Sequence, residues 1–192
     1  MCSAIEYTFS EIMNLPTYGF GAEQGLLAIY VEHPPKLSEY QKLNKVIALQ
    51  DGEIDYINQQ CGNGWRKVFN VYAKFIAELS HPDHDFTNQP EHYPSWQKYR
   101  DKRLLQRGCQ EALLFSAPDL AANRYDWHII AGRTYAKTLL RDHIFTNSLH
   151  WLDEEFAIDP INNLLICPYL DYRQLSNIKI SKLVELLNTG HA

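Results

Sequence analysis

Short apolar runs alternate with segments of helical periodicity along most of this chain. Each run is too short for a typical helix and is followed by polar or proline residues, as is usual for buried strands. Proline cannot donate to a sheet, so Pro34, Pro118 and Pro168 mark the ends of three of these runs. The runs that predict strands are 26–31, 45–49, 112–116, 126–131 and 164–167.

Three further segments have the composition or spacing of helices. Between residues 65 and 79, apolar residues recur at intervals of three and four and therefore share one face. A second helix is predicted to open at Pro94-Ser95 and to run to about Arg107, and a last helix is predicted to end near Gly190. The apolar face of the first helix consists of Trp65, Val68, Phe69, Tyr72, Phe75, Ile76 and Leu79.

The most informative stretch is 126–140, where an apolar strand passes through Gly132 directly into a helix. This junction places Arg133 and Thr134 at a helix N-terminus, where anions and polar ligands are favoured. Strands separated by helices indicate an α/β protein. We therefore predict a single domain over residues 1–192, a three-layer αβα sandwich whose mostly parallel central sheet has about four strands.

The glycine-rich segment 19–25 does not have the spacing of a dinucleotide-binding loop. The dinucleotide-binding motif G-x-G-x-x-G follows a strand. In this segment the third glycine comes one position later than in the motif, and the segment precedes a predicted strand. We interpret the segment as a flexible turn.

Composition narrows the possible functions. The formal net charge is −5, which disfavours non-specific binding of nucleic acid. The four cysteines, Cys2, Cys61, Cys109 and Cys167, are far apart and form neither a zinc motif nor a disulfide framework. No apolar run is long enough to span a bilayer. A cytoplasmic, reduced protein with no cofactor, no metal and no membrane contact is the expectation.

In a parallel sheet, ligands bind outside the carboxyl ends of the strands. Polar residues follow several of the predicted strands, and they include carboxylates, hydroxyls, guanidinium groups and one imidazole. Such a set suits a polar heterocycle or a phosphate, although loops at strand ends are polar in most proteins. The candidate ligand-binding residues are Glu32, His33, Ser116, Asp119, Arg133, Thr134, Tyr169, Asp171 and Arg173.

A basic run interleaved with Trp96 and Tyr99 is a second candidate site. Charge combined with aromatic stacking is typical of proteins that bind single-stranded nucleic acid. A solvated helix face with the same residues is the alternative. The run consists of Lys98, Arg100, Lys102, Arg103 and Arg107.

Two further candidates have structural alternatives. His81 and His84, with neighbouring aspartates, are metal-ligand types in a proline-containing segment, which equally describes a solvated loop. Cys167 ends a strand and is a candidate nucleophile, but a reactive thiol needs a base or a helix N-terminus beside it. A buried structural cysteine is the alternative.

The order of elements resembles the uracil-DNA glycosylase superfamily, which has a mostly parallel four-stranded sheet between helices. Segment 31–35, with His33, is similar to the family's water-activating Asp-Pro motif. Segment 113–116, with Ser116, is similar to the strand whose asparagine reads the base. Segment 128–136 is similar to the strand that ends in glycine before a helix, and segment 166–170, with Cys167, to the His-Pro-Ser motif.

The resemblance implies a site that binds a nucleobase, but the family's acid, asparagine and histidine are replaced here by His33, Ser116 and Cys167. Those groups perform the family's chemistry, so catalysis stays open. The sequence therefore predicts binding of a nucleobase, a nucleotide or a nucleic acid at the strand ends. The alternatives are a non-enzymatic protein-interaction module and a small-molecule hydrolase or transferase that uses His33 or Cys167.

Overall fold

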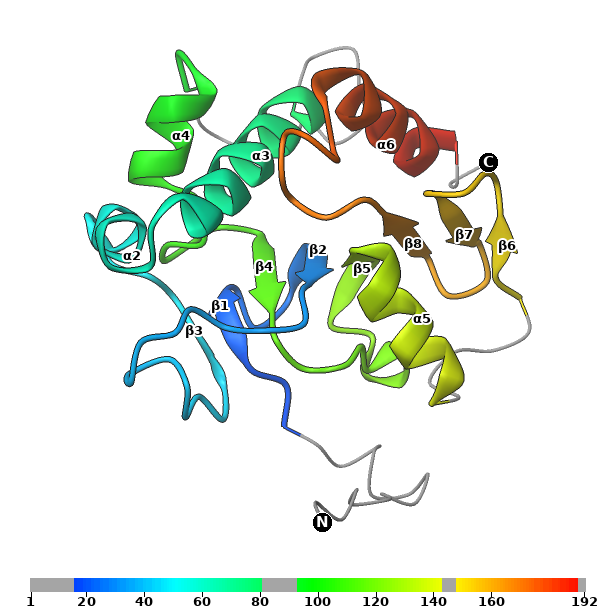
Figure 1. The fold of residues 1–192 in the computed structure, drawn as a ribbon, viewed down its shortest axis with the longest axis horizontal. Helices are drawn as coiled ribbons and strands as arrows, with labels where there is room; N and C mark the ends of the chain where they lie inside the picture. The colour runs from blue at the N-terminus through cyan, green and yellow to red at the C-terminus, as the bar shows by residue number, and fades with distance from the viewer. Residues whose placement is uncertain (1–15, 81–92, 143–147, 190–192) are drawn as a thin grey trace.

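The structure, a computed structural model, describes residues 16–80, 93–142 and 148–189. Within these residues, the strands form one mixed sheet of eight strands in the order β3-β1-β4-β2-β5-β8-β7-β6 (Figure 1). The strands are β1 (Gly19–Gly21), β2 (Gly25–Tyr30), β3 (Val46–Ile47), β4 (Glu111–Leu114), β5 (Tyr125–Ala131), β6 (His150–Trp151), β7 (Ala157–Asp159) and β8 (Leu164–Cys167). The α-helices are α2 (Glu53–Cys61), α3 (Asn63–Leu79), α4 (Trp96–Lys102), α5 (Arg133–Arg141) and α6 (Asn177–Thr189).

The centre of the sheet matches the predicted α/β architecture. Strands β4, β2, β5 and β8 are neighbours and run parallel to one another. The predicted size of the sheet is wrong, because β1 joins β4 in antiparallel orientation and β7 joins β8 in the same way. Strands β3 and β6 complete the two edges, so the sheet is larger and mixed.

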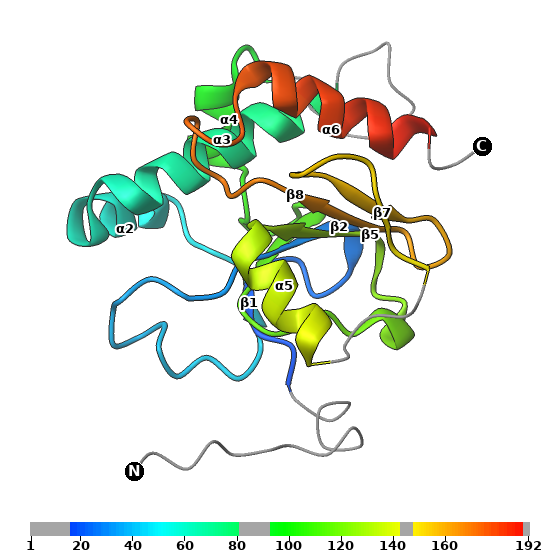
Figure 2. The ribbon, with the colours of Figure 1, turned by 45° about the vertical axis from the view of Figure 1, so that its right-hand side comes forward.

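Helices cover both faces of this sheet, as Figure 2 shows. Helices α2, α3, α4 and α6 lie on one side, and α5 lies on the other. Side chains along each strand alternate between these two layers. In β2, Leu27 and Ile29 belong to the core beneath α3, while Ala28 and Tyr30 belong to the core beneath α5.

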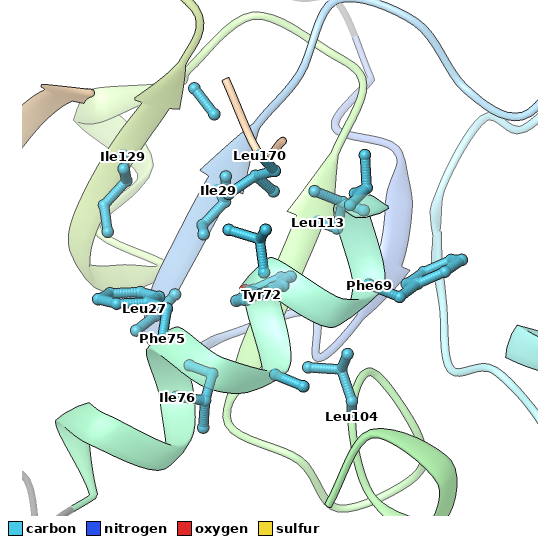
Figure 3. Packing of buried hydrophobic residues seen from close by; sticks show 14 of the residues in the cluster. Leu27, Ile29, Phe69, Tyr72, Phe75, Ile76, Leu104, Leu113, Ile129 and Leu170 are labelled. Atoms are coloured by element: carbon cyan, nitrogen blue, oxygen red, sulfur yellow. The ribbon is translucent and has the colours of Figure 1, made fainter. Parts of the chain in front are cut away.

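Helix α3 forms the larger core with the face that its periodicity predicts. Val68, Phe69, Tyr72, Phe75, Ile76 and Leu79 are all buried, and Trp65 is partly buried. Figure 3 shows Tyr72, Phe75 and Ile76 of α3 packed against Leu27 and Ile29 of β2. The Tyr72 hydroxyl donates to the carbonyl oxygen of Ala112 at 2.8 Å, which fixes the helix to β4.

The interpretation of residues 19–25 as a flexible turn is wrong, because this segment contains β1. Glycine is required here by close packing of the backbone against β4. A Cβ atom on Gly19 would lie 2.2 Å from the carbonyl oxygen of Leu113, and one on Gly21 would lie 2.3 Å from that of Glu111. The absence of side chains thus permits an otherwise impossible strand pairing.

Other boundaries also differ from the predictions. Helix α4 ends at Lys102, well before Arg107, and the following Leu105 has a positive φ of 58°. No predicted strand covers β6 and β7, which form an antiparallel pair. Helix α2 was not predicted. It buries only Ile54 and Ile57, which gives a weak periodic signal.

Some predictions concern residues outside those described. The candidate metal ligands His81 and His84, and the proposed helix end at Gly190, fall in this category. Among the described helices, none has the length and apolar character that crossing a membrane requires.

Candidate functional site

The carboxyl ends of the four parallel strands lie side by side at one edge of the sheet. Tyr30 of β2 is paired with Leu114 of β4 and with Ile130 of β5, and Ala131 of β5 is paired with Cys167 of β8. We call the segments that follow these strands, 31–33, 115–119, 132–135 and 168–173, the carboxyl edge. Their common position follows from the parallel register.

Ser116 is the buried polar residue of the carboxyl edge. Its side chain is 8% exposed, and its hydroxyl has no hydrogen-bond partner among the described residues. The Tyr135 hydroxyl donates to the Ser116 carbonyl oxygen at 3.3 Å. Burial raises the pKa of Tyr135, and the nearby Tyr18 and Glu32 raise it further. Ser116, Tyr135 and Glu32 therefore gather around the start of α5.

Gly132 makes the junction between β5 and α5. Its amide donates to the Cys167 carbonyl oxygen at 2.9 Å, and its φ of 114° turns the chain from strand to helix. A Cβ atom here would lie 3.5 Å from the ring of Tyr169, so the tyrosine packs against the glycine backbone. Arg133 and Thr134 follow and are exposed.

The first backbone amides of α5 have no hydrogen-bond acceptor within the helix. Its first intrahelical bond runs from the Ala136 amide to the Gly132 carbonyl oxygen, and no side chain caps the helix. The amides of residues 133–135 precede that bond and have no acceptor within the helix. Together with the helix dipole, they favour an anion or a carbonyl group at the carboxyl edge.

His33 and Glu32 form the outer part of the edge. The His33 Nε2 atom lies 3.8 Å from a Glu32 carboxylate oxygen, and the His33 side chain is 77% exposed. Nothing buried orients the imidazole, so this pair resembles a solvated ion pair more than a catalytic base.

Asp119 is half-buried in the carboxyl edge, and its charge acts on the core on the α5 side of the sheet. It is close to a buried pair in which the Tyr30 hydroxyl and His128 Nδ1 are 2.7 Å apart. Burial lowers the pKa of His128 to about 4, although the charge of Asp119 opposes that shift. Asp119 thus contributes to the interior of this face.

Asp171 and Arg173 have structural partners. The Lys67 ammonium donates to Asp171 at 2.7 Å, and this bond connects α3 to the loop after β8. Burial would raise the pKa of Asp171, but the bonds from Lys67 and the Arg173 amide lower it below its ordinary value. The Arg173 guanidinium lies over the exposed ring of Tyr172, with its Cζ 5.8 Å from the ring centroid.

Cys167 does not have the surroundings of a nucleophile. It is fully buried, and its thiol donates to the Pro168 carbonyl oxygen at 3.3 Å. Burial raises the pKa of this thiol well above its ordinary value, so the reactive thiolate is disfavoured. The structural alternative fits Cys167 better than a catalytic role.

Much of the basic run is engaged within the molecule. Arg100 contacts Asp101 at 2.7 Å and the Asn70 side chain, and Lys102 contacts Asp51 at 2.9 Å. Arg103 donates to the carbonyl oxygens of residues 107 and 108. These contacts reduce the charge that the run offers to a phosphate backbone and favour the solvated helix face.

A groove beside the carboxyl edge was not expected from the sequence. It has a volume of about 370 Å³ and is lined by Arg133, Lys137, Leu140, Trp151, Asp153 and Glu154. The i, i+4 spacing of the two cations was visible in the sequence, but the hairpin that supplies Trp151 was not predicted. Among the described residues, no group of three or more metal-ligand side chains could hold a metal ion.

The fold and site define a class of α/β protein with helices on both faces of a mixed sheet and a polar edge at its parallel strand ends. Residues 18–188 match the model of a family of unknown function, DUF6942, and the chain belongs to that family. No curated protein and no solved structure matches the chain.

Proposed function

We propose that this protein binds a nucleobase or a nucleotide at the carboxyl edge, and that binding rather than turnover is its principal activity. The observation that carries the proposal is the Ser116 hydroxyl, which is buried at the strand ends and has no partner among the described residues. Buried polar groups normally have a hydrogen-bond partner, and one without a partner destabilises the fold by about 1–3 kcal/mol. A ligand that supplies the missing partner would remove this cost.

The carboxyl edge as a whole has groups that suit a flat heterocycle with polar edges. Tyr169, beside Gly132, offers an aromatic surface, and aromatic rings stack on bases without regard to their identity. The Glu32 carboxylate accepts hydrogen bonds, and the first amides of α5 donate them. The carboxyl edge therefore contains both acceptor and donor groups.

The resemblance to the uracil-DNA glycosylase superfamily remains part of this proposal. It concerns the four parallel strands at the centre of the eight-stranded mixed sheet. His33, Ser116 and Cys167 stand at the positions where the resemblance expects the acid, the asparagine and the histidine. Because Cys167 is buried and His33 is solvated, the proposal contains no catalytic step.

Binding to a panel of free bases, nucleosides and nucleotides tests the proposal. A ligand at 100 times its Kd adds about 2.7 kcal/mol of stability, which raises the Tm of a chain this long by about 5–10 °C. Calorimetry then gives the Kd of each compound that stabilises the protein. Failure of every base-containing compound to bind would refute the proposal.

The variant S116A sharpens this test because its two effects have opposite signs. It removes an unpaired buried hydroxyl, so the ligand-free protein should keep or gain stability. It also removes a ligand contact, so base binding should weaken about three- to tenfold. The control S181A, on the exposed surface of α6, should leave base affinity unchanged. Equal ligand affinity in S116A and the parent would exclude Ser116 from the site.

A further inference from the structure

The groove beside the carboxyl edge extends the proposed site along α5, toward β6 and the turn that follows it. Trp151 of β6 pairs with Ala157 of β7, which pairs with Ile166 near the end of β8. The turn between β6 and β7 therefore lies at the same edge as the ends of the parallel strands. Arg133 belongs both to the carboxyl edge and to the lining of the groove.

Two cations on α5 line the groove one helical turn apart. Lys137 has no ion-pair partner among the described residues, and Arg133 approaches only Glu154, at 3.9 Å. That contact is weak, because 92% of the Glu154 side chain is exposed. The wall formed by α5 therefore offers positive charge, and the free amides at its N-terminus add to it.

The opposite wall cancels only part of this charge. The Asp153 carboxylate accepts from Lys182 at 2.5 Å and from the amides of Glu155 and Phe156. These bonds, led by that of Lys182, lower the pKa of Asp153 to about 2 and keep the group inside its own turn. Glu154 is thus the one acid of the lining that is free to turn away.

Trp151 supplies an apolar surface to the same groove. Paired residues on neighbouring strands project to the same face of a sheet. Ala157 belongs to the core beneath α5, so its partner Trp151 faces α5 as well. The indole is 41% exposed, and the volume of about 370 Å³ is within the range of small-molecule sites.

Resting on the proposed function, we infer that the groove is a phosphate subsite and that the ligand is a nucleotide rather than a free base or a nucleoside. The base lies near Ser116, the ligand crosses the N-terminus of α5, and the phosphate lies between Arg133 and Lys137. Trp151 packs against the ribose and phosphate end. The charges of the wall and the ligand are complementary.

Calorimetric titration with a nucleoside, its mono-, di- and triphosphates, and inorganic pyrophosphate tests this inference. We expect the phosphorylated forms to bind at least about tenfold more tightly than the nucleoside, because each charge-assisted contact contributes about that factor. This preference should shrink as salt is added. Ligand-induced quenching of tryptophan fluorescence should be lost in W151F.

Variants separate the two parts of the site. K137A should weaken nucleotide binding about tenfold and leave nucleoside binding unchanged, because Lys137 lies outside the carboxyl edge. R133A should weaken nucleotide binding by a similar factor. E154Q should strengthen nucleotide binding, since it removes the competing carboxylate. The matched control is R141A, at the far end of α5, where Arg141 pairs with Asp142 at 3.0 Å. It should bind both ligands like the parent protein.

The outcomes distinguish the inference from the proposed function. Equal affinity for nucleoside and nucleotide, or full nucleotide affinity in K137A, overturns the phosphate subsite and leaves the base site intact. Binding of pyrophosphate that depends on Lys137, without any preference for base-containing compounds, overturns the base site and leaves an anion groove. If no compound binds, both fail.

Discussion

At the scale of single residues, two polar side chains buried in the sheet, Glu111 and His128, differ in their hydrogen bonds and in how burial shifts their pKa. Glu111, at the start of β4, accepts hydrogen bonds from the amides of Leu105 and Gln110, both at 3.0 Å. Burial raises its pKa despite these bonds. His128, in the middle of β5, is 3% exposed and shares one hydrogen bond with Tyr30. The imidazole is therefore held in its neutral form.

His128 should make the stability of the protein depend on pH. Its pKa is about 4 in the folded state, against an ordinary value of 6.5, so the unfolded chain binds the proton more readily. The neutral His128 therefore contributes its full share of the stability above pH 6.5, and this contribution is lost as the pH falls toward 4. The full loss is about 3 kcal/mol, measured as the free energy of unfolding in urea at several pH values.

The variant H128N should show a smaller decline over this range, because its side chain does not titrate. H150N, at an exposed position of β6, is the control and should retain the parent's slope. An identical pH dependence in H128N and the parent protein would show that His128 is not the group responsible.

At the scale of elements, strand β1 depends on the two glycines that flank Phe20 where it meets β4. Gly21 has a φ of 107°, and a Cβ atom would lie 2.3 Å from a backbone oxygen. G21A should therefore destabilise the protein by about 2–4 kcal/mol through strain and overpacking. Gly64, in the first turn of α3, has no atom within 4 Å of its Cβ position.

G64A is the matched control and should stabilise the protein by about 0.5–1 kcal/mol through helix propensity. Chemical denaturation measures both changes. A Gly21 variant as stable as the parent would mean that β1 can move away from β4 without cost.

The success of sequence-based prediction varied among elements for physical reasons. The periodic face of α3 and the strand–glycine–helix junction at Gly132 were predicted, because many consecutive residues report one period. Strands β1 and β6 were not, because two or three residues carry no measurable alternation. In β1, moreover, Phe20 is the single side chain between two glycines, which leaves no alternation to detect.

The same distinction applies to the candidate site. The rule for parallel strands selects Ser116, Arg133 and Tyr169 as candidates from the ends of long apolar runs, and the structure places all three at the carboxyl edge. It could not identify Lys137 and Trp151, because their proximity depends on how the β6–β7 turn lies against α5. It also selected Asp119 and Asp171, whose roles within the fold are set by contacts distant in sequence.

At the scale of the whole molecule, stability should decrease from the centre of the sheet to its edges. Strands β2 and β5 are bordered by partners on both sides and covered by helices on both faces. Strands β3 and β6 have two residues each and one partner. Local opening at these edges costs little compared with opening the centre.

Native-state hydrogen exchange should reveal this gradient. Amides of β2 and β5 should exchange only through global unfolding, with the same free energy as that measured by denaturant. Amides of β3 and β6 should exchange through smaller openings with little dependence on denaturant. Uniform protection across all eight strands would contradict the gradient.

The brevity of β3 and β6 also affects how copies of the chain meet. A long open border would present a row of unused donors and acceptors, on which a neighbouring chain could continue the sheet indefinitely. Here the edge strands β3 and β6 have two residues each, so a strand added to either would form few backbone hydrogen bonds. The short edge strands therefore disfavour growth of the sheet into fibres.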